Sequence, residues 1–302
     1  MKNKYLLAKI ICRILPPIIA QTIRTKIIST KEGELLALDF VKKSFTGSYF
    51  YGNTRDFHAF KFSIHGFFDW RNIIIGQTIL KNFINGDIIE VGANIGTETI
   101  SFADIANRNN VNVYAYEPVP DNFNNLTKIK EKNNLDNLIL SSAIVSDYIG
   151  TANFKIPTKN DSGSGHITND TTKEKFQVIN LDSNHENNRI SLICVDVEGY
   201  EYQVLRGAQK IIQTQSPYLI IEVNKNYLEN RGNIKLTEIY NFIKSLNYEC
   251  YYIKPLGLEK IDINNFKIYP NKNWLCIPNK SSNSYKKISN SIFFKAINPC
   301  VS

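Results

Sequence analysis

Five residues that could hold a ligand lie within or directly after two apolar segments of the chain. Residues 87–91 are an apolar run that contains the carboxylate Glu90, and Gly92, Asn94 and Gly96 follow at alternate positions. A second apolar run, residues 113–116, leads to the carboxylate Glu117. Glycine lets the backbone turn sharply and approach a ligand without a Cβ in the way. A strand, a glycine turn and a helix form the arrangement that holds nucleotide-like ligands in doubly wound α/β folds.

The chemistry of this turn differs from that of a dinucleotide site. A pyrophosphate binder has the spacing G-x-G-x-x-G, whereas this chain has E-x-G-x-N-x-G. Glu90 would repel a phosphate but suits an ammonium group, such as the one on the amino-acid end of S-adenosylmethionine. Glu117 stands 21 residues beyond Gly96, where this fold class places the acid that accepts from ribose hydroxyls. Each acid alone could simply end a strand, but together they predict a class I methyltransferase.

Three more acids follow the ends of later apolar strands. Asp196 comes directly after residues 190–195, Glu198 follows two positions on, and Glu222 lies near the end of residues 218–223. Since ligands bind outside the carboxyl ends of parallel strands, we expect these acids on the same rim as the glycine turn. They could serve as a base for an acceptor hydroxyl or as metal ligands. They could also be acids that complement the dipole of the next helix.

The elements that must position these residues alternate between strands and helices from residue 81 onward. This alternation is typical of parallel βαβ units. It predicts a doubly wound α/β fold with a mostly parallel, Rossmann-like sheet of seven strands and helices on both faces. The predicted strands are residues 87–91, 113–116, 138–144, 190–195, 218–223, 248–253 and 274–277.

Residues 151–189 interrupt the alternation and are rich in Gly, Ser, Asn and Thr. They contain an edge strand at residues 176–181 and His166, which follows the run S-G-S-G. His166 is an alternative base, and its loop could close over the site. A flexible surface loop is the simpler interpretation, and we favour it.

The two ends of the chain carry the excess positive charge. The net charge of the 302 residues is +8, yet residues 1–31 and 263–302 contain Lys and Arg and no Asp or Glu. The remainder is net acidic, which argues against a nucleic-acid-binding face on the folded domain. We therefore divide the chain into a basic leader (1–31), an aromatic-rich cap (32–80), a methyltransferase domain (81–279) and a loosely held basic tail (280–302).

The leader is too short and too interrupted by charges for a transmembrane helix. Its apolar residues share a helical face, with lysines elsewhere, so it could rest on an anionic membrane. We favour the simpler interpretation, a helix packed on the domain or a mobile segment. The five cysteines lack a C-x-x-C pair and the four histidines lack metal-ligand spacing. Reduced thiols and a cytoplasmic location, with peripheral membrane contact as an option, are therefore expected.

These motifs resemble the FkbM family of S-adenosylmethionine-dependent methyltransferases over roughly residues 80–278. The resemblance implies methyl transfer, usually to an oxygen, on sugars of surface glycans or on secondary metabolites. The family often has Asp where this chain has Glu90. The resemblance rests on residues 90–96, Tyr116-Glu117-Pro118, residues 196–201, residues 204–208, Pro217 and residues 220–222.

The motifs and the resemblance together give a set of expected site residues. The expected cofactor contacts are Glu90, Gly92, Asn94, Gly96, Glu117, Pro118, Ala143 and Asp196. The expected catalytic residues are Asp196, Glu198 and Glu222, with His166 as the alternative. A divalent metal such as Mg would be held by Asp196 and Glu222. The expected partner is a small-molecule or glycan acceptor, whose identity the sequence does not give.

Three other functions compare less well with the sequence. A dinucleotide-dependent sugar oxidoreductase would share the fold, but Glu90 and Asn94 argue against it. A nucleic-acid methyltransferase would need a basic core and an Asn/Asp-Pro-Pro-Tyr motif, and the chain has neither. A non-catalytic cofactor-binding module stays open, as does the oligomeric state.

Overall fold

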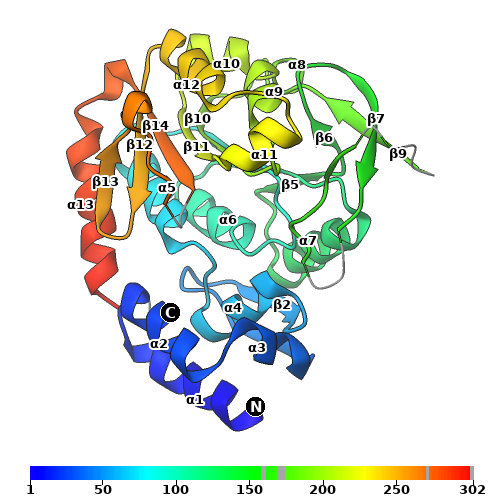
Figure 1. The fold of residues 1–302 in the computed structure, drawn as a ribbon, viewed down its shortest axis with the longest axis vertical. Coiled ribbons are helices and arrows are strands. Elements are labelled where there is room, and N and C mark those ends of the chain that lie inside the picture. Colours follow the sequence, from blue (N-terminus) through cyan, green and yellow to red (C-terminus); the bar gives the residue numbers. More distant parts are fainter. Residues whose placement is uncertain (158–160, 169, 171–173, 270–271, 300–302) are drawn as a thin grey trace.

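The computed structural model describes residues 1–157, 161–168, 170, 174–269 and 272–299. Its centre is an eight-stranded sheet with helices on both faces (Figure 1). From one edge to the other, the strands are β13 (Gly257–Lys260), β12 (Tyr248–Lys254), β14 (Asn273–Pro278), β11 (Tyr218–Glu222), β10 (Ile190–Val195), β3 (Asp87–Val91), β4 (Val113–Tyr116) and β5 (Leu138–Ser141).

The strands from β11 to β5 run parallel, and β14, β12 and β13 join them antiparallel. Strands of a parallel sheet are covered on both faces, which is why β10 is buried along its whole length and apolar apart from Ser191. The strand order reverses between β3 and β10, where doubly wound sheets bind their ligands. The predicted fold class is confirmed. The count of seven strands is wrong, because β13 forms a hairpin with β12 at the edge.

Two helical layers cover the sheet because successive side chains of each strand point to opposite faces. Ile88 contributes to one apolar cluster and Ile89 to the other. On the first face lie α5 (Trp70–Asn82), α6 (Thr99–Asn107), α7 (Pro120–Asn133) and α13 (Ser284–Ile297). On the second lie α9 (Glu201–Arg206), α10 (Gln209–Gln215), α11 (Lys225–Asn230) and α12 (Leu236–Ser245).

The basic tail is ordered over most of its length. Helix α13 buries Ile288 and Ile292 in the first apolar cluster and packs along α5. The expectation of a loosely held tail is therefore wrong for Ser284–Ile297. Residues 300–302, including Cys300, lie outside the described residues. The other cysteines are free thiols.

A second, smaller sheet lies beside the edge of the first at β5. It consists of β6 (Ile144–Val145), β9 (Lys175–Ile179), β7 (Gly150–Lys155) and β8 (His166–Ile167). The strand predicted at residues 138–144 is thus divided between the two sheets. The strand predicted at residues 176–181 corresponds to β9, but its predicted place at an edge is wrong, because β9 lies between β6 and β7 in the small sheet.

The N-terminal region forms a layer at one end of the molecule, drawn in dark blue at the bottom of Figure 1. Helix α1 packs against α2 and α4, burying Tyr5, Ala8 and Cys12 against Phe60 and Ile64. No helix among the described residues combines the length and hydropathy needed to cross a bilayer. The elements of this layer are α1 (Lys2–Ile14), α2 (Pro17–Ile27), α3 (Thr30–Leu36), β1 (Asp39–Lys43), β2 (Tyr49–Asn53) and α4 (Phe57–His65).

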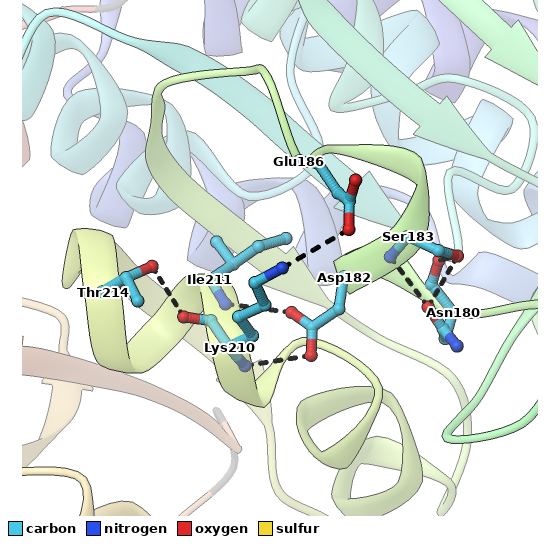
Figure 2. A network of polar contacts seen from close by, with 7 residues as sticks. All are labelled: Asn180, Asp182, Ser183, Glu186, Lys210, Ile211 and Thr214. Carbon is cyan, nitrogen blue, oxygen red and sulfur yellow. Dashed lines mark hydrogen bonds and ion pairs between the residues drawn. The ribbon is translucent and has the colours of Figure 1, made fainter.

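A polar contact fixes α10 to the short helix α8 (Leu181–Asn184) (Figure 2). The first turn of α10 has no side-chain cap from its own N-cap residue, Ala208. Instead, the carboxylate of Asp182 accepts hydrogen bonds from the backbone N–H groups of Lys210 and Ile211, both at 2.9 Å. A residue distant in sequence thus satisfies the donors that a helix start leaves free.

Candidate active site

A pocket opens at the carboxyl ends of β3, β4 and β10, as the strand order requires. Most residues expected to form the site lie on its wall, although they come from five different strands and the turns after them. Those residues are Glu90, Gly92, Asn94, Glu117, Pro118, Ala143, Asp196, Glu198 and Glu222. Gly96 and His166 are not on the wall.

The glycine turn is shaped by two close approaches. Gly92 has φ +87°, and a Cβ there would lie 1.9 Å from the carbonyl oxygen of Asp196. Asn94 also adopts a left-handed backbone, with φ +52°. Gly96 has φ +90°, and a Cβ there would lie 2.9 Å from Cδ2 of Leu126. Gly92 therefore joins the turn to the end of β10, and Gly96 lets α7 pack against the turn.

Glu90 is buried at the bottom of the pocket. Its Oε2 atom has no hydrogen-bond partner among the described residues. Burial, with a further contribution from the charge of Glu117, raises the pKa of Glu90 to about 8, against the effect of the nearby Thr99 hydroxyl, which lowers it. A buried carboxylate with an unpaired oxygen costs free energy unless a proton or a cation compensates it. The site thus favours a positively charged ligand group at this point.

Glu117 has a structural role that the sequence did not indicate. Its Oε2 accepts from the backbone N–H of Asn94 at 2.8 Å, and its Oε1 accepts from the N–H of Val119 at 2.9 Å. The amide of Asn122 donates to Oε1 at 3.4 Å. Burial raises the pKa of Glu117 to about 7, although these three donors lower it. The carboxylate therefore holds the glycine turn against the start of α7 and also faces the pocket.

The three acids after β10 and β11 converge as expected. Asp196, Glu198 and Glu222 each place one carboxylate oxygen within 4.8 Å of the others. The side chain of Asp196 is exposed to the pocket. Partial desolvation by the pocket wall, followed by the charges of Glu222 and Glu198, holds the pKa of Asp196 well above its ordinary value. Such a group of carboxylates retains a proton or attracts a cation near neutral pH.

Glu198 is held in an unusual conformation. Its φ is +58°, a backbone region that is strained for a residue with a side chain and is often found at functional sites. Its Oε2 accepts a hydrogen bond from Arg231 at 3.2 Å, and the Arg231 guanidinium lies 3.8 Å from the ring centroid of Tyr227. Burial and the charge of Glu222 raise the pKa of Glu198 to about 7, against the effect of Arg231.

Glu201 shows that one acid of this segment serves the helix rather than the pocket. It is buried and accepts hydrogen bonds from the backbone N–H groups of Gly199 at 3.0 Å and Val197 at 3.3 Å. Glu201 thus complements the start of the following helix, which is the alternative role that the sequence left open for the acids of this segment. Asp196 and Glu198 face the pocket instead.

Other residues of the wall come from segments where the sequence gave no functional signal. His58 of α4 lines the pocket with its ring against Phe68, and its Nδ1 lies 3.9 Å from Oδ1 of Asp56. Burial lowers the pKa of His58. On α5, Asn72 donates a hydrogen bond of 2.9 Å to Glu98. His58 lies in an aromatic-rich segment without periodicity, so only the folded arrangement reveals it.

The loop that contains Ser162 and Gly163 forms part of the pocket wall. The N–H of Ser162 donates to Asp56 at 3.1 Å, and its carbonyl accepts from Asn122 at 3.1 Å. A Cβ on Gly163 would lie 3.0 Å from Cε1 of His58. The loop therefore joins α4 to α7 above the glycine turn. His166 faces away, with its Nδ1 3.0 Å from the carbonyl of Ser164, and residues 158–160 lie outside the described residues.

Comparison with known proteins finds a methyltransferase family and a methyltransferase relative. The family model described as Methyltransferase FkbM domain matches residues 90–250. Hexuronic acid methyltransferase AglP of Haloferax volcanii is 28% identical over 152 residues, which are 49% of this chain and 60% of that protein. The match thus spans less than two thirds of that relative's length.

Solved structures of low sequence identity also match. A methyltransferase FkbM from Methylobacillus flagellatus is 13% identical with a TM-score of 0.43, over 91% of this chain and 58% of that one. A precorrin-6y C5,15-methyltransferase from Geobacter metallireducens is 10% identical with a TM-score of 0.39, over 68% of this chain and 85% of that one.

Proposed function

Because the chain belongs to the FkbM family of methyltransferases, we propose that it transfers a methyl group from S-adenosylmethionine to a hydroxyl oxygen of a sugar. The observation that carries the proposal is the carboxylate of Glu90, buried beside the glycine turn with one oxygen unpaired. The similarity to a methyltransferase of hexuronic acids supports a sugar, and specifically a glycan or an activated sugar, as the acceptor.

The residues of the pocket fit the cofactor. Glu90 would pair with the ammonium group, and the free lone pairs of Glu117 would accept from the ribose hydroxyls. Gly92 would let the cofactor approach the backbone, with Pro118 and Ala143 on the same wall. When bound, S-adenosylmethionine supplies a methyl group that its sulfonium centre has already activated. The protein's main task is therefore to position the acceptor oxygen in line with that methyl group.

Asp196 would remove the proton of the acceptor hydroxyl. A carboxylate whose pKa is raised toward neutrality is a stronger base than an ordinary aspartate. Glu222 and Glu198 keep that pKa raised. A divalent cation such as Mg, held by Asp196 and Glu222, would instead lower the pKa of the hydroxyl. His58 is the second group to test as a base, because it lines the pocket and His166 does not.

The test is a methyl-transfer assay with S-adenosylmethionine labelled in its methyl group. Acceptors are nucleotide sugars and lipid-linked glycans, with and without a uronic acid. We expect label in the sugar fraction, and we expect Asp196→Asn to lose about 10²–10⁴-fold in turnover while keeping most of its affinity for the cofactor. EDTA distinguishes Asp196 acting as the base from Asp196 acting as a metal ligand, since it abolishes turnover only if a divalent cation takes part.

Three outcomes would contradict the proposal. If calorimetry detects no binding of S-adenosylmethionine, the cofactor assignment is wrong. If the cofactor binds and no acceptor is labelled, the chain acts as a binding module or on another acceptor class. Normal turnover by Asp196→Asn removes Asp196 as the base and leaves His58, tested as His58→Gln.

A further inference from the structure

Helix α1 is apolar on two opposite faces, and the rest of the chain covers only one of them. Its inner face packs against α4 through Tyr5, Ala8 and Cys12. Its outer face carries Leu6, Leu7, Ile10 and Ile14, which are 54%, 49%, 69% and 71% exposed. These four recur at the spacing of one helical stripe. The larger aliphatic side chains of α1 are thus on the solvent side, where a monomeric soluble protein rarely gathers them.

Cations surround this stripe. Lys2, Lys9 and Arg13 lie on α1, and residues 1–31 contain no acid. Lys4 pairs with Glu32 of α3 at 2.7 Å. Lys2 and Arg13 have no ion-pair partner among the described residues. The positive charge of α1 is therefore mostly uncompensated by the protein itself.

The fold brings the other basic end of the chain to the same place. Helix α13 runs along α5 and contacts α2, and Figure 1 shows the lower end of α13 next to α2. Its last turns expose Phe293, Phe294 and Ile297, at 42%, 60% and 49%. Residues 263–302 also lack acids. Two segments at opposite ends of the sequence thus meet at one end of the molecule, both basic and both with exposed apolar side chains.

We propose that the outer face of α1, extended by the end of α13, docks on the surface of an anionic lipid bilayer. The stripe would enter the boundary between headgroups and acyl chains, and the cations would face anionic headgroups. A second copy of the chain fits this face less well, because two acid-free basic faces repel each other. With 13 residues, α1 is too short to span a bilayer and would lie in its plane.

The position of α4 connects this surface to the pocket. Phe60 and Ile64 of α4 pack beneath α1, whereas His58 of the same helix lines the pocket. Docking through α1 would therefore place the bilayer beside the layer that covers the pocket. The inference about the surface does not depend on the proposed function.

The experiment is flotation of the full chain with vesicles of phosphatidylcholine, alone or mixed equally with phosphatidylglycerol. We expect binding only to the anionic vesicles, and release at high salt. The double variant Ile10→Ser/Ile14→Ser should bind at least tenfold more weakly. Lys2→Gln/Arg13→Gln should lose about fivefold for each charge at low ionic strength, since each cation contributes about 1 kcal/mol.

Matched controls use side chains of the same types elsewhere on the surface. Ile149→Ser/Ile268→Ser removes two isoleucines that are 66% and 80% exposed, and Lys81→Gln/Lys132→Gln removes two exposed lysines. Neither control should change vesicle binding. Thermal unfolding checks that every variant is folded.

The proposal is overturned if the unmodified chain stays unbound at low salt, or if the Ile10→Ser/Ile14→Ser variant floats as well as the controls. It is also overturned if sedimentation shows a dimer that this variant abolishes, because a second copy would then cover the stripe. Since vesicle binding is measured without cofactor or acceptor, a failed methyl-transfer assay would leave this result intact.

Discussion

At the scale of single residues, Glu117 combines two tasks that compete for the same atoms. Each of its two oxygens accepts a hydrogen bond from a backbone N–H group, that of Asn94 or that of Val119. The same carboxylate lies on the pocket wall, where it can meet a ligand. A carboxylate oxygen has lone pairs to spare, so one group can hold the turn and still accept from a ligand. An amide cannot do so, because its NH₂ would face one of the two N–H donors.

We therefore expect Glu117→Gln to lower the free energy of unfolding by about 1–3 kcal/mol, the cost of leaving a buried donor without a partner. It should also weaken the binding of S-adenosylmethionine by roughly tenfold. Urea denaturation and calorimetry measure the two effects, with the exposed Glu131→Gln as the control. Reduced stability with unchanged affinity would show that Glu117 only positions the turn.

At the scale of elements, the glycine turn after β3 and the end of β10 are built as one unit. Gly92 leaves no room for a side chain between them, because a Cβ would meet the carbonyl oxygen of Asp196. The candidate base and the candidate cofactor loop are thus in backbone contact. A displacement of either one would be transmitted to the other.

Gly92→Ala tests this unit. With φ +87° and a contact of 1.9 Å, the added methyl group should destabilise the fold by about 1–3 kcal/mol. It should also impair both cofactor binding and turnover. Gly150→Ala is the control, since a Cβ there has an ordinary contact of 3.6 Å with Tyr148. A Gly92→Ala variant as stable and active as this control would refute the close packing of the turn.

The sequence predicted the elements that have a strong local pattern. Apolar runs that end at acids identified β3, β4, β10 and β11, and the sheet topology then brought their ends to one pocket. It missed features that depend on contacts between distant segments. The cap of α10 comes from Asp182, and His58 faces the pocket only because α4 lies over it. The sequence analysis also missed helix α13, because its sequence is polar and rich in Ser and Lys and its buried stripe is narrow.

At the scale of the whole molecule, buried acids make stability depend on pH near neutrality. The pKa is raised to about 8 for Glu90 and to about 7 for Glu117, Glu198 and Glu201, mainly by burial. A raised pKa means that the folded chain holds protons that the unfolded chain has already lost. Stability from these groups is complete below their ordinary pKa and is lost as the pH rises through the folded values.

We expect the free energy of unfolding to fall between pH 6.5 and pH 8, by on the order of 1 kcal/mol per pH unit. Below pH 6.5 the histidines make the free energy of unfolding rise with pH, because burial lowers the pKa of His58 and His185 and lowers that of His65 to about 3. Above pH 8, Lys61 also makes the free energy of unfolding rise with pH, since burial lowers its pKa to about 8. Urea denaturation across this range with EDTA present measures the fall. A flat or rising curve would mean that the acids are ionised without penalty.

Part of the pocket wall comes from outside the segment that matches the family. The family match covers residues 90–250, whereas His58 and Asn72 precede it and Asn273 follows it. The family match thus contains the part of the pocket that we propose for the cofactor, whereas these three residues of the wall come from the segments that flank it. We expect substrate choice to diverge by replacement of these flanking residues, so that exchanging them between two relatives should exchange their acceptors while leaving the binding of S-adenosylmethionine unchanged.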